Sequence, residues 1–218
     1  MVKAVIFDMD GLMVDTEIIS YKAYGMFLKE HGLEKLSKEE YCHCFAGKSL
    51  QNGLLYARDY FQLSYTVEEG VDFFIKKEKE IFDNEGVQLK PGLVELLSYL
   101  KEHNVKTAMA TSSGLERVHK ILDNHKVLDY FDAIICGDMV KRGKPAPDIF
   151  LKACEVLNVN GEDALVLEDS ETGIKAAYSA NVPVICIPDM KVPEGEYRDM
   201  TTTILNNLTE VITFIESR

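Results

Sequence analysis

Short apolar segments alternate with amphipathic segments over most of this chain, and this alternation limits the possible folds more than any other feature. Apolar runs of strand length predict strands at residues 2–7, 106–110, 133–136, 164–167, 184–187 and 202–205. Helical spacing of apolar residues predicts helices at 93–102, 115–124, 148–157, 173–180 and 208–215. Strands separated by helices pair in parallel and carry helices on both faces. The predicted class is α/β, with a doubly wound parallel sheet.

The segment from residue 15 to residue 84 interrupts this alternation. It contains helical patterns at 18–31 and 67–82 but no convincing strand. A segment of about seventy residues is too long for a plain connection between two elements. We therefore predict an α-helical subdomain of residues 15–84, inserted into a core of residues 1–14 and 85–218. Gly86, near the return to the core, offers the backbone freedom of a hinge.

The composition of the 218-residue chain excludes several classes of protein. Hydrophobic residues make up 46%, which is enough for a core, but no apolar run is long enough to span a membrane. The 5 cysteines, an odd number scattered along the chain, predict no disulfide framework. We expect a soluble protein of the cytoplasm. The net charge of −12 would repel nucleic-acid polymers and anionic membranes, so the expected partner is a small molecule.

Two aspartates stand directly after the first predicted strand. Asp8 and Asp10 follow the apolar run, and Gly11 lets the chain turn sharply where a side chain would obstruct a ligand. Ligands of open α/β sheets bind at the carboxyl ends of the strands. The pair is therefore a candidate nucleophile with its proton-transfer partner. Alone, the same residues are better explained as a polar turn or part of a calcium loop, so the interpretation depends on residues further along.

Hydroxyl groups follow the second predicted strand. Thr111, Ser112 and Ser113 precede a predicted helix, and Ser113 and Glu116 have the spacing of a capping box. Hydroxyl and backbone N–H donors gathered at a helix N-terminus can bind phosphate. Thr111 and Ser112 are therefore candidate phosphate ligands, although a polar helix cap without a ligand has the same pattern.

Charged residues follow two later strands. Lys144 lies between Gly143 and Pro145 at a strand-to-helix turn, where it is less free than a surface lysine and can neutralise phosphate or carboxylate. Glu168 and Asp169 end an all-apolar strand, which is costly unless a cation holds them. These two acids are candidate metal ligands.

In chain order, these motifs resemble the four motifs of the haloacid dehalogenase superfamily of phosphotransferases. The matching residues are Asp8, Asp10 and Gly11, then Thr111, then Lys144 and Pro145, then Glu168 and Asp169. The longer runs 7–17, 143–148 and 167–170 are similar to the β-phosphoglucomutase-like branch of that superfamily. The resemblance covers essentially the whole chain. It implies a Rossmann-like core with strand order 3-2-1-4-5, and a helical cap formed by the inserted segment.

The resemblance also implies a mechanism and a cofactor. Asp8 would attack the phosphate and form an aspartyl-phosphate, while Asp10 would protonate the leaving alcohol and then take a proton from the hydrolytic water. Mg²⁺ would be held by Asp8, by the backbone carbonyl of Asp10 and by Asp169. Glu168 would lie in or near the first coordination shell of the metal.

The substrate implied by the resemblance is a small phosphorylated metabolite, either a sugar phosphate or a nucleoside 5′-monophosphate. Its phosphate oxygens would be held by Thr111, Ser112 and Lys144. Helix packing or a solvated helix face explains the polar side chains of the cap as well as substrate binding does. Four of them are candidate substrate contacts: Tyr21, Tyr24, Lys48 and Lys76.

Three other functions share parts of this pattern. A phospho-receiver module also uses an aspartate, a hydroxyl and a lysine, but its acidic metal pair follows the first strand and it has no helical insertion. A haloalkanoate dehalogenase needs neither magnesium nor Asp10. The nearest alternative is a β-phosphoglucomutase-type mutase. The cap histidine and arginine of a mutase correspond here to Ser20 and Leu50, which favours hydrolysis, while Lys48 is a candidate substitute for the arginine.

Overall fold

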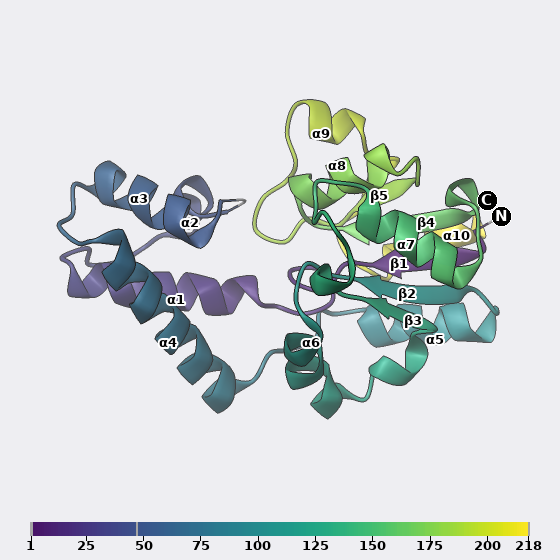
Figure 1. Ribbon diagram of the computed structural model, residues 1–218, viewed down its shortest axis with the longest axis horizontal. Coiled ribbons are helices and arrows are strands. Elements are labelled where there is room, and N and C mark those ends of the chain that lie inside the picture. The colour runs from purple at the N-terminus through teal and green to yellow at the C-terminus, as the bar shows by residue number, and fades with distance from the viewer. Residues whose placement is uncertain (1, 47, 218) are drawn as a thin grey trace. The chain divides into compact units, whose positions relative to one another are not determined.

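The chain forms two compact units in the computed structural model, which describes residues 2–46 and 48–217 (Figure 1). One unit consists of Met1–Val14 and Leu89–Arg218, and the other of Asp15–Gln88. Among the described residues, no helix combines the length and the apolar character needed to cross a membrane.

The second boundary between the units lies at residue 88, whereas the sequence analysis placed it at residue 84. The last helix of the insertion continues to Glu85. Beyond it, the backbone N–H of Asp15 donates to the Gln88 carbonyl at 2.9 Å. Val14 and Leu89 then form an antiparallel bridge. The predicted boundary was early because this pairing of the outgoing and returning chain has no signature in local spacing.

Over the described residues, the first unit is built on a six-stranded sheet in which all neighbours are parallel. The strands are β1 (Ala4–Phe7), β2 (Lys106–Ala110), β3 (Ala133–Ile135), β4 (Ala164–Glu168), β5 (Val184–Cys186) and β6 (Thr203–Ile204). Their order is β3-β2-β1-β4-β5-β6. All residues of β1 and β4 are buried, as expected of strands covered on both faces. The predicted doubly wound Rossmann-like sheet is confirmed, with β6 extending the implied order.

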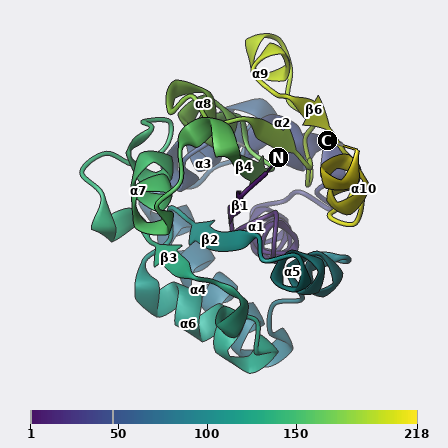
Figure 2. The same cartoon turned by 90° about the vertical axis from the view of Figure 1, so that its right-hand side faces the viewer.

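Helices cover both faces of this sheet (Figure 2). Helix α7 packs on β1, β2 and β3, and α8 packs on β4 and β5, while α5 packs on β2 and contacts α10. Because side chains alternate along a strand, Ala4 and Ile6 share one face of β1, where they join a buried cluster with Phe150 of α7 and Ile174 of α8. The helix bounds are α5 (Leu93–Glu102), α6 (Leu115–Leu122), α7 (Asp148–Leu157), α8 (Glu171–Ser179), α9 (Glu196–Asp199) and α10 (Glu210–Glu216), with short 3-10 turns at Asp123–His125, Leu128–Tyr130, Gly137–Met139 and Gly161–Asp163.

The second unit, over its described residues 15–46 and 48–88, contains four helices and no strand. They are α1 (Glu17–Glu30), α2 (Lys38–Cys44), α3 (Leu50–Phe61) and α4 (Val67–Glu85). The sequence analysis located α1 and α4 but not the shorter α2 and α3. Helices α2 and α4 each begin with a capping box, in which a Ser or Thr hydroxyl and a Glu carboxylate satisfy each other's backbone N–H groups. The interior of this unit is aromatic: Tyr24, Phe27, Tyr41, Phe45, Tyr65 and Phe74.

Candidate active site

The carboxyl edge of the sheet brings the sequence motifs together. The Asp8 N–H donates to the Leu167 carbonyl at 3.0 Å, which extends the β1–β4 ladder by one residue beyond Phe7. The Thr111 N–H donates to the Ile135 carbonyl at 3.0 Å and extends the β2–β3 ladder in the same way. Because parallel strands end at one edge of the sheet, Asp8, Thr111 and Glu168 are presented on the same side.

Lys144 connects the ends of three strands, β1, β2 and β4, through its ammonium group. Its Nζ donates to Asp8 Oδ1 at 2.5 Å, to Glu168 Oε1 at 2.6 Å and to the Ala110 carbonyl at 3.0 Å. The ammonium also lies 5.0 Å from the ring centroid of Phe150. The Lys144 side chain is only 5% exposed, so the ion pairs are shielded from water.

The charges in this cluster shift one another's pKa. Burial raises the pKa of the Asp8 carboxyl, Lys144 partly offsets this, and Glu168 and Asp10 raise it again. Burial alone would lower the pKa of Lys144, but attraction to Asp8 and Glu168 outweighs it, so the pKa lies above its ordinary value. Lys144 therefore remains a cation and partly neutralises the two acids.

Both carboxylate oxygens of Glu168 accept hydrogen bonds. Oε1 accepts from Lys144, and Oε2 accepts from the backbone N–H groups of Asp169 and Ser170 at 3.1 Å each and from the Ser170 hydroxyl at 2.9 Å. The carboxylate fits only because α8 presents Gly173, where a Cβ would lie 1.8 Å from Glu168 Oε1. Glu168 thus holds both Lys144 and the turn that follows β4.

Asp169 lies against the sharp turn after β1. Gly11 has a φ of +83°, and a Cβ there would lie 2.2 Å from Asp169 Oδ2, so glycine is required both for the turn and for this close approach. Carboxylate oxygens of Asp8, Glu168 and Asp169 lie within 4.8 Å of one another, the only such trio among the described His, Cys, Asp and Glu residues. Burial, with the neighbouring Glu168 and Asp8, raises the pKa of Asp169 well above its ordinary value. These clustered oxygens fit a hard divalent cation.

Asp10 is half-buried and is held by the loop and helix that follow β2. The Ser113 hydroxyl donates to Asp10 Oδ2 at 2.8 Å, and Arg117 of α6 lies 3.4 Å from Oδ1. The predicted capping box of Ser113 and Glu116 was wrong, because α6 begins after Gly114 and has no side-chain cap. The Ser113 hydroxyl is directed to Asp10 and not to the helix backbone.

The two candidate phosphate ligands after β2 differ in exposure. Thr111 is buried, and its Oγ1 accepts from the Ser113 N–H at 3.0 Å, which leaves its own hydroxyl proton available to another acceptor. Ser112 is exposed, and its carbonyl packs so closely on Gly137 that a Cβ there would lie 2.4 Å away. In the loop 111–113, Ser112 is therefore the exposed residue, while Thr111 is buried and Ser113 donates to Thr111 and Asp10.

Of the four candidate cap contacts, Tyr21 and Tyr24 lie one turn apart on α1 and both pack on the Tyr41 ring, while the two lysines lie on other segments of the helical unit. The Tyr21 hydroxyl donates to the Leu36 carbonyl at 2.7 Å. Tyr24 is 6% exposed and stacks on Phe45 at 3.8 Å between ring centroids. These contacts give both tyrosines a packing role. The two lysines are exposed: Lys76 on α4, and Lys48, whose ammonium donates to the His43 carbonyl at 2.6 Å and lies 5.0 Å from the Tyr56 ring centroid.

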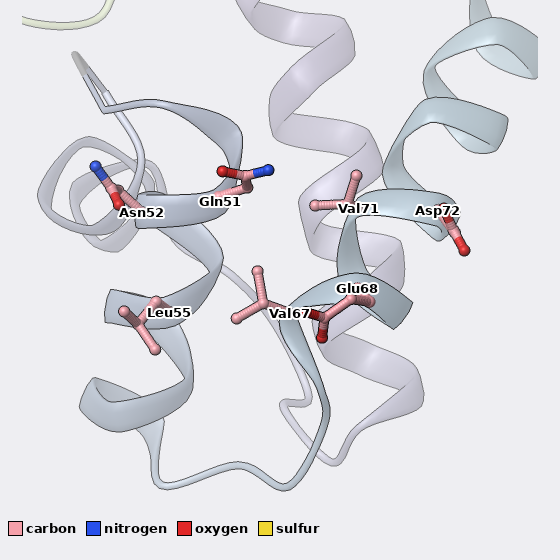
Figure 3. Close-up of a pocket in the computed structure, with 7 residues that line it drawn as sticks. All are labelled: Gln51, Asn52, Leu55, Val67, Glu68, Val71 and Asp72. Carbon is pink, nitrogen blue, oxygen red and sulfur yellow. The ribbon is translucent and has the colours of Figure 1, made fainter.

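A pocket of about 380 Å³ lies between α3 and α4 of the helical unit (Figure 3). Its apolar lining comes from both helices, and its polar lining consists of carboxamides on α3 and carboxylates on α4. A phosphate dianion needs hydrogen-bond donors or cations around it, and two carboxylates would repel it. The pocket therefore does not match the substrate expected from the core motifs. The lining residues are Gln51, Asn52, Leu55, Val67, Glu68, Val71 and Asp72.

Three contacts of the site were not found from the sequence. Gly173 was assigned only to a helix, although the nearby Glu168 signals that something must make room for a buried carboxylate. Ser113 was assigned to the wrong partner, and Arg117 was not considered. Both contact Asp10 across more than one hundred residues of chain, a separation for which local spacing carries no signal.

The parallel sheet, the acidic edge and the buried lysine agree with a family match over most of the chain. A model of the haloacid dehalogenase-like hydrolase family matches residues 5–187. The chain belongs to this family and is an enzyme of the phosphatase type.

Within the family, the chain is similar to the following two relatives and one solved structure. A phosphorylated carbohydrates phosphatase of Thermotoga maritima is 36% identical over 184 residues, covering 83% of this chain and 82% of that protein. The β-phosphoglucomutase of Bacillus subtilis is 32% identical over 194 residues, covering 83% and 80%. A HAD family hydrolase of Deinococcus radiodurans, solved with bound phosphate and sodium, has a TM-score of 0.87 at 25% identity and covers 99% of this chain and 96% of its own. These similar proteins therefore include both hydrolases and a mutase.

Proposed function

We propose that the protein is a Mg²⁺-dependent hydrolase of small phosphate monoesters that acts through an aspartyl-phosphate on Asp8. The observation that carries this proposal is the cluster at the sheet edge. Asp8 Oδ1 lies 2.5 Å from a buried ammonium, and its carboxylate is within 4.8 Å of those of Glu168 and Asp169. A nucleophilic carboxylate that attacks a dianion needs this concentration of positive charge and metal ligands beside it.

The metal is assigned from the donor set. Asp8 and Asp169 would provide carboxylate oxygens, and by the family resemblance the backbone carbonyl of Asp10 would provide a third oxygen. Because both oxygens of Glu168 already accept hydrogen bonds, we assign Glu168 to holding Lys144 and Asp169 in place. When bound, Mg²⁺ would neutralise charge between the attacking carboxylate and the phosphate.

The remaining roles follow from the contacts in the core unit. Lys144 stabilises the ionised form of Asp8 and balances the charge that builds on the phosphate oxygens. Thr111 and Ser112 donate to those oxygens from the rigid loop after β2. Asp10, held from α6 and its preceding loop, gives a proton to the leaving alcohol and later accepts one from water.

The cap is the part of the proposal that concerns the rest of the substrate. We propose that the helical unit selects a phosphorylated carbohydrate, because the Thermotoga maritima relative at 36% identity is a phosphorylated carbohydrates phosphatase. Nucleoside 5′-monophosphates remain the second substrate class to be tested.

Hydrolysis is favoured over a mutase reaction by residues of the helical unit. Ser20 and Leu50 stand where the mutase pattern has a histidine and an arginine, and neither can replace the charge of those residues. Lys48 is the candidate substitute, but its ammonium already donates to the His43 carbonyl at 2.6 Å. A mutase must hold a second phosphate, and these observations do not favour a second phosphate site in the helical unit.

A screen of phosphate release tests the proposal. Purified protein is incubated with a panel of sugar phosphates and nucleoside monophosphates, with Mg²⁺ or with EDTA. We expect turnover of sugar phosphates that requires Mg²⁺. Full turnover in EDTA would contradict the metal assignment, and no turnover of any monoester would contradict the enzyme class.

A second incubation separates the hydrolase from the mutase. The substrate is β-glucose 1-phosphate with a trace of the 1,6-bisphosphate. We expect phosphate release without isomerisation to glucose 6-phosphate. Rapid formation of glucose 6-phosphate would show that the mutase alternative is correct.

A further inference from the structure

We propose that Ser113 is a positioning residue that fixes the Asp10 carboxyl for proton transfer and couples it to the phosphate-binding loop. The proposal rests on the function of Asp10 proposed above. It assigns Ser113 a role in departure of the leaving group, separate from phosphate binding and from the attack by Asp8.

The contacts of Ser113 run in two directions from one short loop. Its backbone N–H donates to Thr111 Oγ1 at 3.0 Å, and its hydroxyl donates to Asp10 Oδ2 at 2.8 Å. Thr111 is buried, and its N–H is bonded to β3, so the loop is anchored to the sheet. Asp10 is half-buried and follows β1. Ser113 therefore links the Asp10 side chain to the anchored loop at the edge of the sheet.

The direction of the Ser113 hydrogen bond determines which oxygen of Asp10 can carry the proton. Because the Ser113 hydroxyl donates to Oδ2, the protonated carboxyl carries its hydrogen on Oδ1. Arg117 lies 3.4 Å from Oδ1, at the long end of the hydrogen-bond range. The contact to Ser113 is the shorter and better defined of the two, so the proposal depends on Ser113.

Proton transfer and bond cleavage must coincide for a poor leaving group. An Asp8 oxygen forms a bond to phosphorus, and the bond from phosphorus to the ester oxygen breaks with its electron pair remaining on that oxygen. The Oδ1 proton of Asp10 moves to the same oxygen and gives the neutral alcohol. A sugar alkoxide needs this proton, whereas p-nitrophenolate leaves without it. Misplacing Asp10 should therefore slow the cleavage of sugar phosphates but not of p-nitrophenyl phosphate.

The test measures the first step in single turnover for Ser113→Ala. The substrates are the sugar phosphate that wild-type protein hydrolyses fastest in the panel, and p-nitrophenyl phosphate. We expect a loss of roughly 10- to 100-fold on the sugar phosphate, the size typical of a misplaced catalytic group. On p-nitrophenyl phosphate we expect a loss below about threefold. Ser113→Thr, which keeps the hydroxyl, should restore most of the sugar phosphate rate.

A double-mutant cycle with Asp10→Asn shows whether Ser113 acts through Asp10. If it does, Ser113→Ala adds no further loss on the sugar phosphate in the Asp10→Asn background. Ser179→Ala, at the exposed end of α8, is the matched control for loss of a serine hydroxyl. Thermal midpoints and circular dichroism of all variants separate these effects from misfolding.

The outcomes distinguish this proposal from the proposed function. If Asp10→Asn slows both esters equally, the proton-transfer role of Asp10 fails and the Ser113 proposal fails with it. If Asp10→Asn is selective for the sugar phosphate but Ser113→Ala is neutral or slows both esters equally, only the Ser113 proposal is overturned. Additive losses in the cycle would also overturn it, because Ser113 would then act independently of Asp10.

Discussion

The carboxyl edge of the sheet and the helical unit use charged side chains in opposite ways. At the sheet edge, Lys144 and Glu168 have side chains that are 5% and 0% exposed. In the helical unit, Lys77 and Glu80 form an ion pair of the same length, 2.6 Å, but their side chains are 31% and 43% exposed. Water screens the second pair and not the first. Ion-pair distance alone therefore does not show where charge is held for chemistry.

The two regions also differ in what keeps them folded. The polar cluster at the sheet edge is tied together by Lys144, which donates to Asp8 and Glu168, and by the backbone N–H groups after β4 that donate to Glu168. The helical unit is held by an aromatic interior and by capping boxes, with most of its charges at the surface. Buried polar contacts therefore hold the sheet edge together, whereas apolar packing holds the helical unit together.

Removing a metal ligand should give the largest effect at the sheet edge. We expect Asp169→Ala to lower phosphatase activity about 10⁴-fold, because it removes several kcal/mol of charge stabilisation that the metal provides to the transition state. Steady-state assays over a range of Mg²⁺ concentrations measure this loss. Glu80→Ala in the helical unit is the control and should retain activity. An Asp169→Ala variant with wild-type turnover would contradict the metal assignment.

Breaking the buried ion pairs should be the second largest effect, measured on stability. Lys144→Met leaves two buried carboxylates without their cation and should destabilise the protein by about 3–5 kcal/mol. Lys77→Met removes an exposed pair of equal length and should not shift the denaturation midpoint measurably. Urea unfolding of both variants makes the comparison. Equal shifts of the urea midpoint in the two variants would mean that burial does not make the ion pairs of Lys144 more important for stability than that of Lys77.

Adding one methyl group to a helix should have opposite effects in the two units. Gly173→Ala places a Cβ 1.8 Å from Glu168 Oε1 and should destabilise the core by about 1–3 kcal/mol while displacing Glu168. In α1, a Cβ at Gly25 would meet only the Leu36 Cβ at 4.0 Å, so Gly25→Ala should stabilise the protein by about 0.5–1 kcal/mol. Thermal melts and activity assays of the two variants test this. A neutral or stabilising Gly173→Ala would contradict the close packing of Gly173 on Glu168.

The smallest expected effect is a pH dependence confined to the helical unit. Hydrogen bonds from the Ser37 N–H and hydroxyl lower the pKa of Glu40 below its ordinary value of 4.5. The resulting stabilisation is present above pH 4.5 and is lost as the pH falls through the lower, folded pKa. Glu40→Gln should remove this dependence, whereas Glu39→Gln, at an exposed neighbour, should keep it. Thermal midpoints of wild type and both variants are measured between about pH 3 and pH 6. The same pH dependence in Glu40→Gln as in wild type would contradict the account.

The sequence predicted the parts of the fold and site that depend on local pattern. The strands of the core, the position of Asp8 at the end of β1 and that of Glu168 at the end of β4 follow from apolar runs that end in acids. The adjacency of β1 and β4 came from the family resemblance and is confirmed by their pairing. Strand ends in a parallel sheet meet at one edge, so motifs far apart in sequence could be placed together.

The parts that the sequence did not predict depend on contacts between distant segments. Ser113 has the local spacing of a helix cap, and only its approach to Asp10 redirects the hydroxyl. Gly173 is required by the carboxylate of Glu168, which a helical pattern does not reveal. Helix α2 is only 7 residues long, and α3 contains Asn52 and Gly53, which are weak helix formers, so local pattern gave little signal for either helix.

The central claim is that Asp8 carries the phosphoryl group during the reaction, and acid-quenched single turnovers test it most directly. Protein is mixed with the fastest substrate of the panel, quenched within a fraction of a turnover, and analysed by peptide mass spectrometry after borohydride reduction of acyl-phosphate. The account predicts one modified residue, Asp8, at a level that rises and falls within the turnover, and no modification in Asp8→Asn. Product formation by Asp8→Asn, or a phosphoryl group on another residue, would contradict it.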